Sequence, residues 1–416
     1  MTLLKGAAVV GQSGGPTAAI NATLSGVIKA VINDNGDHIT SLLGMRNGIE
    51  GLLRDDLIDL TAAFTKDGGP DGEKLSLLEG TPAAALGSCR KKLPDPDKDR
   101  TFFDGLIEIF RKYDVRYFFY IGGNDSMDTV LKLSKYLRTS DYEMRCVGIP
   151  KTIDNDLAGT DHTPGFGSAA KYIAVTLKEI VRDCSVYTVP AVTVVEIMGR
   201  DAGWLTAAAG LPNDIPGAGP DLIYLPERPF SLDAFLEDVK EVHSRKPAVV
   251  VAVSEGLRFA DGRYVGEGTQ SGAADVFGHK YLAGTAKALE LFIKEKLGCK
   301  VRSIELNLPQ RCASHLASLT DITESVATGS EGVRSAIAGK TGVMVTAKRA
   351  PGAEYSISFD ASDISGIANE IRTVPDEYIN ERGNGVTPAC LDYLRPLIKG
   401  EVSPTYRDGL PVHLVI

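Results

Sequence analysis

Short apolar runs alternate along the chain with segments in which apolar residues recur every three or four positions. The apolar runs are residues 7–10, 117–121, 146–149, 192–197 and 249–253. Helical periodicity marks residues 21–33, 101–113, 127–137, 169–184, 232–244 and 283–296. Near-continuous apolar strands that alternate with such helices are typical of parallel sheets covered on both faces. The pattern therefore predicts an α/β protein with doubly wound parallel sheets.

Each apolar run leads into a loop of glycine and polar residues. These loops read Gly-Gln-Ser-Gly-Gly at 11–15, Gly-Gly-Asn-Asp-Ser at 122–126, Pro-Lys-Thr-Ile-Asp-Asn-Asp at 150–156, Met-Gly-Arg-Asp at 198–201 and Ser-Glu-Gly at 254–256. Glycine makes up 44 of the 416 residues, which exceeds the typical share of ~7%. Ligands of parallel sheets bind beyond the carboxyl ends of the strands. We therefore expect these loops to line one cleft.

Three regions are expected along the chain. The pattern predicts an N-terminal α/β domain at residues 1–165 and a second α/β domain at residues 166–308. Residues 309–416 predict a helical segment, one further strand and an extension that packs back on the two domains. Prolines punctuate the last part, which predicts an irregular, extended tail after residue 351: Pro375, Pro388, Pro396, Pro404 and Pro411.

The loop at 11–15 fits three interpretations. Backbone N–H groups ahead of a helix can cradle a phosphate. The same G-x-S-x-G spacing is the nucleophile elbow of serine hydrolases, which needs a later acid and a later histidine. His243, His279, His315 and His413 follow, but none stands in a strand-end loop. A purely structural turn is the third interpretation.

Asp154 and Asp156 lie two residues apart in the loop 150–156, close to Lys151. Like charges in a strand-end loop cost stability through repulsion and desolvation unless a function requires them. One carboxylate can accept a proton from a hydroxyl while the lysine offsets charge on a leaving phosphate. The set favours phosphoryl transfer over a solvated acidic turn.

Other strand-end loops carry side chains suited to an anionic or hydroxylated ligand. Arg200 offers a planar fork for phosphate or carboxylate, and Glu255 can accept hydrogen bonds from sugar hydroxyls. Both are also consistent with an interdomain salt bridge. In the loop 122–126, Asp125 or Ser126 either lies against a ligand or caps the following helix.

The composition narrows the class of protein. The chain carries 45 basic and 54 acidic residues, for a net charge of −9, which argues against binding to nucleic acid or to an anionic membrane. No apolar run approaches the ~20 residues of a membrane span, and the first residues are too few for a signal peptide. Six scattered cysteines without a C-x-x-C pair argue against zinc knuckles and disulfides. We expect a soluble, cytoplasmic protein that acts on small molecules.

The ordered motifs GQSGGP, LGSCR, GGNDS, PKTIDND, TPGFGSA, MGRDAGWL, SEG and PQR, spread over residues 5–342, closely resemble those of the phosphofructokinase family. The tail resembles the extension of the pyrophosphate-using members. The resemblance implies two Rossmann-like domains with the active site in the cleft between them, the first on the phosphoryl-donor side and the second on the sugar-phosphate side. It also implies Mg²⁺ and phosphoryl transfer to the C1 hydroxyl of fructose 6-phosphate, a step of glycolysis and gluconeogenesis.

The resemblance assigns roles to individual residues. Asp154 is implied as the general base, Asp156 and Thr152 as groups that orient the substrate and support metal binding, and Asn124 as the metal ligand. Arg302 and Arg311 fall where the family uses arginines on the 6-phosphate, one of them from a neighbouring subunit, so a homodimer or homotetramer is expected. The further substrate-binding positions implied are Gly15, Arg90, Ile153, Met198, Gly199, Arg200 and Glu255.

Asp125 and Lys151 stand where ATP-using members generally have glycine. We expect Asp125 to be a buried anion that repels a nucleotide's α-phosphate and Lys151 to compensate it and to neutralise the pyrophosphate leaving group. This pair predicts pyrophosphate as the donor. An ATP-dependent kinase of the same fold stays an alternative. So does a non-catalytic regulatory subunit, because the family usually has aspartate at Asn124 and often has arginine at Ala191.

Further departures lie on the acceptor side. Leu308 replaces a usual histidine or tyrosine, and Cys312 and Ala313 replace a glycine pair. A looser acceptor pocket follows, which makes sedoheptulose 7-phosphate a plausible additional acceptor.

Overall fold

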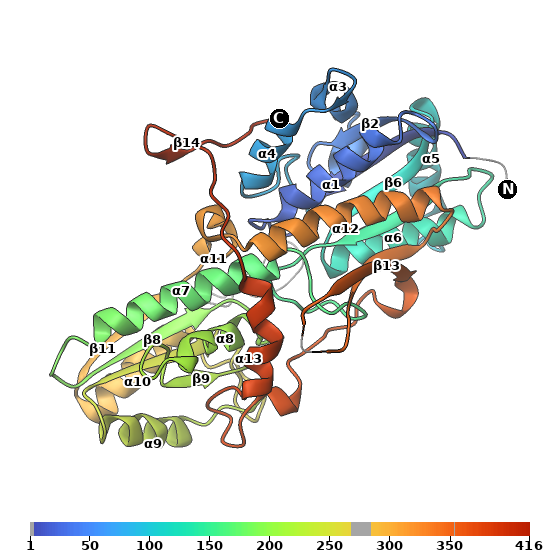
Figure 1. Cartoon of the computed structure of the whole chain (residues 1–416). Helices are drawn as coiled ribbons and strands as arrows, with labels where there is room; N and C mark the ends of the chain where they lie inside the picture. Colours follow the sequence, from blue (N-terminus) through green and yellow to red (C-terminus); the bar gives the residue numbers. More distant parts are fainter. Residues whose placement is uncertain (1–3, 268–283, 353) are drawn as a thin grey trace.

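Two separate β-sheets each organise one lobe of the chain in this computed structural model (Figure 1). The structure describes residues 4–267, 284–352 and 354–416. Three of the positions discussed above lie outside the described residues: the N-terminal residues 1–3 of the signal-peptide argument, the candidate histidine His279, and position 283 at the start of the predicted helix 283–296.

The first lobe is built on a seven-stranded sheet of order β13-β12-β7-β6-β1-β2-β3. Its strands are β1 (Gly6–Gln12), β2 (Ile39–Met45), β3 (Leu57–Asp59), β6 (Val115–Gly122), β7 (Arg145–Pro150), β12 (Val343–Arg349) and β13 (Ile357–Asp363). The central strands pair in parallel, as predicted, whereas the edge strands β3 and β13 are antiparallel to their neighbours. The strand order reverses between β1 and β6, so the loops after these two strands flank a topological switch point.

Helices cover both faces of this sheet. They are α1 (Ile20–Asn33) and α12 (Leu319–Ile337) on one face and α5 (Arg100–Lys112) and α6 (Asn124–Leu137) on the other. Successive residues of β1 point to opposite faces, so Val9 packs in one core while Ala8 and Val10 pack in the other. Burial on both faces explains why the strands read as nearly continuous apolar runs.

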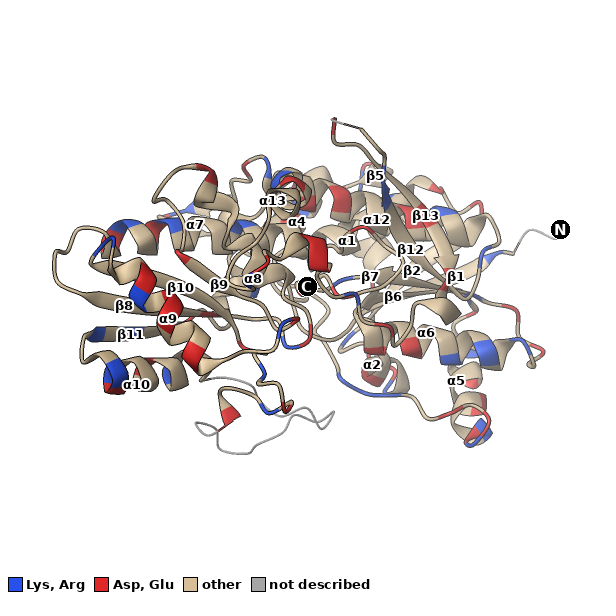
Figure 2. Cartoon of the chain, turned by 90° about the horizontal axis from the view of Figure 1, so that it is seen from below, with Lys and Arg blue, Asp and Glu red and all other residues tan. Residues whose placement is uncertain are grey.

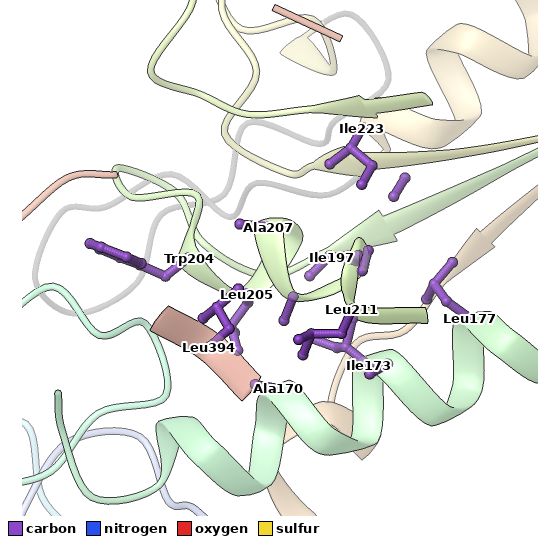
Figure 3. Packing of buried hydrophobic residues seen from close by; sticks show 14 of the residues in the cluster. Ala170, Ile173, Leu177, Ile197, Trp204, Leu205, Ala207, Leu211, Ile223 and Leu394 are labelled. Carbon is purple, nitrogen blue, oxygen red and sulfur yellow. The ribbon is translucent and has the colours of Figure 1, made fainter. Parts of the chain in front are cut away.

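The second lobe is built on a four-stranded, fully parallel sheet of order β11-β8-β10-β9. Its strands are β8 (Ala191–Ile197), β9 (Leu222–Tyr224), β10 (Ala248–Ser254) and β11 (Lys300–Glu305). The covering helices are α7 (Phe166–Cys184) and α8 (Trp204–Ala208) on one face and α9 (Leu232–His243) and α10 (Thr285–Leu297) on the other. Figure 3 shows the first of these cores, in which Ile173 of α7, Ile197 of β8 and Leu205 of α8 belong to one apolar cluster.

Shorter elements connect these layers. They are α2 (Ile49–Leu53), α3 (Leu60–Phe64), β4 (Thr65–Lys66), β5 (Gly69–Pro70), α4 (Gly72–Gly80), η1 (Leu211–Asp214), α11 (Pro309–Cys312), η3 (Ser314–Leu316), η4 (Ile364–Gly366), η5 (Asp376–Tyr378), α13 (Pro388–Leu394), η6 (Arg395–Ile398), β14 (Tyr406–Arg407) and β15 (Leu410–Pro411). In Figure 2 most charged residues lie on helices and connecting loops, and the central strands are largely uncharged. Among the described residues, no helix is both long and apolar enough to cross a membrane.

The C-terminal region corrects the prediction of an irregular, extended tail. β12 and β13 complete the first sheet, so the chain returns from the second lobe to the first. α13 then buries Cys390 and Leu394 completely in the core of the second lobe. Pro388 stands at the start of this helix, where the missing N–H of proline has no intrahelical partner to lose. Pro388, which the pattern treated as a breaker, therefore begins a helix instead.

Candidate active site

Loops from both lobes meet at a cavity of about 530 Å³. The contributing loops follow β1, β6 and β7 of the first sheet and β8 and β10 of the second, which are the carboxyl ends of parallel strands. The cavity brings together these residues from the predicted site: Gly15, Arg90, Asn124, Asp125, Lys151, Thr152, Ile153, Asp154, Asp156, Met198, Arg200, Glu255 and Arg311. Gly199 lies next to them, because its N–H donates to Glu255 Oε1 at 3.2 Å.

The loop after β1 presents backbone to two cationic side chains. Gly14 has a φ of +77°, and a Cβ there would come within 3.4 Å of the Lys151 ammonium. A Cβ on Gly15 would come within 3.3 Å of an Arg311 guanidinium nitrogen. Lys151 Nζ also donates to the Gly15 carbonyl. A glycine backbone between two cations is suited to holding an anion.

Ser13 does not have the geometry of a hydrolase nucleophile. Its side chain is buried, and its hydroxyl donates to the Cys89 carbonyl at 3.4 Å. The loop is held by backbone bonds, from Ser13 N–H to the Ile121 carbonyl and from Gly14 N–H to the Cys89 carbonyl. The phosphate-cradle interpretation of residues 11–15 is the one that this geometry supports.

The loop after β7 holds the titratable groups of the cavity. Burial lowers the pKa of Lys151, which is 2% exposed, to about 8. Desolvation by the cavity walls, together with the charge of Asp156, raises the pKa of Asp154 to about 7. Desolvation also raises the pKa of Asp156. A carboxyl group that titrates near neutral pH is suited to accept a proton from a hydroxyl.

The backbone of this loop is fixed by its own residues. The Asp154 N–H donates to Thr152 Oγ1 at 3.1 Å. The next residue, Asn155, is fully buried with a φ of +56°, and its Oδ1 accepts from the Thr163 N–H at 3.1 Å. Asparagine tolerates this left-handed conformation better than most residues. The turn therefore sets the direction of the neighbouring Asp154 and Asp156 side chains.

Asp125 corrects the prediction of a buried anion compensated by Lys151. Its side chain is 43% exposed, and it forms an ion pair with Lys92 at 3.1 Å. Asp125 lies in the first turn of α6, and Gly123 occupies the N-cap position without a side-chain cap. Neither Asp125 nor Ser126 is therefore the cap. Lys92 was missed as a site residue, although its position two residues after Arg90 in a basic stretch was a signal for it.

The second lobe contributes the loops that carry Met198, Arg200 and Glu255. Burial, together with the charge of Asp154, raises the pKa of Glu255 to about 8. The Met198 N–H donates to Gln310 Oε1 at 3.0 Å, which ties this loop to α11. Gly199 has a φ of +126°, and a Cβ there would lie 2.5 Å from the Ala202 carbonyl. Only glycine accommodates this turn.

Arg302 does not reach the cavity of its own chain. It lies on β11 and lines a separate, small pocket with Cys184, Tyr187 and Lys300. Two further cavity residues, Asn369 and Ile371, come from the C-terminal region that the sequence presented as an appendage. The prolines of this region predicted an irregular tail and did not indicate that Asn369 and Ile371 lie at the cavity.

Asn124 offers a feature that fits a metal ion. Its Oδ1 is buried at the cavity and has no hydrogen-bond partner among the described residues. Amide oxygens are ligands that Mg²⁺ accepts, and Mg²⁺ usually takes the rest of its ligands from water and phosphate. No cluster of three or more histidine, cysteine or acidic side chains suited to a metal occurs in the described part of the chain.

Comparisons with known proteins agree on the family. The pyrophosphate–fructose 6-phosphate 1-phosphotransferase of Methylococcus capsulatus is 42% identical over 407 residues, which cover 97% of this chain and 94% of that protein. The enzyme of the same name from Halomonas elongata is 41% identical over 96% of this chain and 93% of its own length. The crystal structure of a pyrophosphate-dependent phosphofructokinase from Nitrosospira multiformis, 39% identical, superposes with a TM-score of 0.87 over 99% of this chain and 96% of that chain. Residues 7–332 match the phosphofructokinase family itself, and the chain belongs to that family.

Proposed function

We propose that this chain is an enzyme that transfers a phosphoryl group from pyrophosphate to the C1 hydroxyl of fructose 6-phosphate, giving fructose 1,6-bisphosphate and phosphate. The observation that carries the proposal is the donor side of the cavity, where Lys151 contacts the glycine loop and Asp125 pairs with Lys92. Two lysines suit a compact, highly charged donor, and an aspartate disfavours a longer polyphosphate. The names of relatives more than 40% identical, two of which are given above, support the same donor.

The reaction divides between residues of the two lobes. Asp154 accepts the proton of the C1 hydroxyl while the oxygen attacks the nearer phosphorus of pyrophosphate, and the bridging P–O bond breaks to release phosphate. Lys151 and Arg90 offset the charge on the departing phosphate. The donor and product bonds have similar energies, so the transfer is reversible.

The remaining assigned residues bind the substrates. Arg200, Arg311 and Glu255 hold the sugar phosphate through charge and hydroxyl contacts. Met198, Gly199, Thr152 and Ile153 shape the pocket around the sugar, and Asp156 supports the base. A bound Mg²⁺ would neutralise pyrophosphate oxygens, and Asn124 Oδ1 would be its ligand from this chain. Gly15 supplies backbone to the donor.

Arg302 acts on a neighbouring subunit in this proposal. It lies outside the cavity of its own chain. Arg302 can therefore contact the 6-phosphate of a bound sugar only in the cavity of another subunit. The proposed assembly is a homodimer or homotetramer in which each cavity receives Arg302 of the partner subunit.

A donor assay on the purified chain tests the proposal. With fructose 6-phosphate and Mg²⁺ present, formation of fructose 1,6-bisphosphate is expected with pyrophosphate and not with ATP. Faster turnover with ATP would identify the ATP-dependent alternative. Absence of turnover with either donor would favour a non-catalytic subunit, an alternative that the altered position Asn124 suggests.

A further inference from the structure

The C-terminal region contacts the loop that carries Asp154. The Arg372 N–H donates to the Asp156 carbonyl at 2.8 Å, and Ile371 forms an antiparallel bridge with Leu157. Ile371 and Arg372 therefore lie alongside the end of the loop. We call residues 369–394 the tail clamp.

Tyr393 of α13 holds the same loop at its other side. Its hydroxyl accepts a hydrogen bond from Asn155 Nδ2 at 3.0 Å and donates to the Asp161 carbonyl at 2.7 Å. Asn155 directly follows Asp154 and has the left-handed backbone described above. The Tyr393 hydroxyl of the tail clamp thus connects Asn155, which follows Asp154, with Asp161 further along the same segment.

The tyrosine is itself fixed in place. The Arg372 guanidinium lies 4.4 Å from the Trp204 ring and 5.5 Å from the Tyr393 ring, and Trp204 Nε1 donates to the Arg372 carbonyl at 3.0 Å. The adjacent Leu394 is fully buried in the core of the second lobe, where Figure 3 shows it near Leu205. The Asp154 loop belongs to the first sheet but is tied by Tyr393 to the second lobe.

We propose that Tyr393 is a positioning residue for phosphoryl transfer, acting through Asn155 on the direction of the Asp154 carboxylate. This inference rests on the proposed function. General-base catalysis needs hydrogen-bond distance between base and hydroxyl, and a displacement of about 1 Å can cost on the order of 100-fold in rate. Neither Tyr393 nor Asn155 lines the cavity, so their effect on turnover passes through Asp154.

Tyr393→Phe tests the inference, because it removes the hydroxyl and keeps the ring that packs with Trp204 and Tyr378. Loss of the hydroxyl should lower kcat about tenfold or more and leave both KM values within about twofold. It should also move the acid limb of the kcat profile to lower pH, because a loosened loop admits water to Asp154. The matched control is Tyr355→Phe, which removes another hydroxyl of the C-terminal region, one that donates to Glu324 of α12 at 2.8 Å. We expect this control to keep kcat and the acid limb of the parent.

Asn155→Gly supplies a second measurement, because glycine keeps the left-handed turn without the amide. If Tyr393 acts through Asn155, the double variant should have the kcat of the slower single variant. Equal kcat in the parent, Tyr393→Phe and Tyr355→Phe would overturn the inference. A double variant whose loss of kcat is the product of the losses of the two single variants would also overturn it. A parent enzyme without pyrophosphate-dependent turnover would instead overturn the proposed function on which the inference rests.

Discussion

The loops after β6 and β7 each place an aspartate in the same cavity, yet the two aspartates have different surroundings. Asp125 is 43% exposed and paired with Lys92. Asp154 is desolvated, with Asp156 nearby, and its pKa is raised to about 7. The exposed side chain of Asp125 is therefore accessible to a charged ligand. Asp154 is placed instead to exchange a proton near neutral pH.

The lysines repeat this contrast. Lys92 is half-exposed, whereas Lys151 is almost fully buried and burial lowers its pKa to about 8. In the proposed function, the loop after β6 therefore contacts the donor through Asp125, whereas the loop after β7 carries the groups whose protonation controls the reaction. Each of the test variants below removes one or two of these four charged side chains.

Replacement of the base should have the largest effect. Asp154→Asn keeps the size of the side chain but removes proton acceptance, so kcat with pyrophosphate should fall on the order of 10³-fold. KM for fructose 6-phosphate should change little. The measurement is initial-rate formation of fructose 1,6-bisphosphate. A loss below about tenfold would mean that another group takes the proton.

Removal of the donor charges should have the next largest effect. Asp125→Gly together with Lys151→Gly should lower kcat/KM for pyrophosphate by about 100-fold, because Lys151 no longer offsets the charge of the donor, and should make turnover with ATP measurable, because a negative side chain no longer stands on the donor side. Steady-state rates with each donor provide the test, and KM for fructose 6-phosphate is the internal control. An unchanged preference for pyrophosphate would contradict the role of these two positions.

The exposed ion pair should give the smallest effect. Lys92→Gln should raise KM for pyrophosphate by about two- to fivefold without changing kcat, because exposed ion pairs contribute less than about 1 kcal/mol. The neighbouring Lys91 is exposed and does not line the cavity, so Lys91→Gln is the matched control. Equal KM values for the two variants would separate Lys92 from donor binding.

The architecture was largely predictable because two-sided burial leaves a direct mark on the sequence. Strands such as β1 and β10 are buried along their whole length and therefore read as continuous apolar runs. The antiparallel edge strand β13 has a mostly half-exposed pattern, which gives no such run. α13 was missed because its proline, Pro388, resembles a helix breaker, although proline fits the first turn of a helix.

Most residues that line the cavity could be predicted from the sequence, but their ion-pair partners could not. Strand-end position identified the loops of Asp154 and Glu255, but it does not specify exposure or ion-pair partners. Asp125 therefore pairs with Lys92 and not with Lys151, a tertiary choice that the local sequence does not encode. The position of Arg302 outside the cavity of its own chain likewise depends on how β11 lies in the second sheet.

The pH dependence of kcat/KM for fructose 6-phosphate, measured for the parent enzyme and for Asp154→Asn, tests the assignment of the base most directly. Asp154 must be deprotonated to accept a proton, and its raised pKa predicts that the parent rate falls as the pH drops below about 7. Titration of the substrates affects both proteins equally, so the ratio of the two rates isolates the group that was replaced. We predict that the rate of the parent divided by the rate of Asp154→Asn declines below about pH 7. If the rate of the parent divided by that of Asp154→Asn stayed constant from about pH 5 to about pH 8, a range that includes the pKa of Asp154, the result would contradict the assignment.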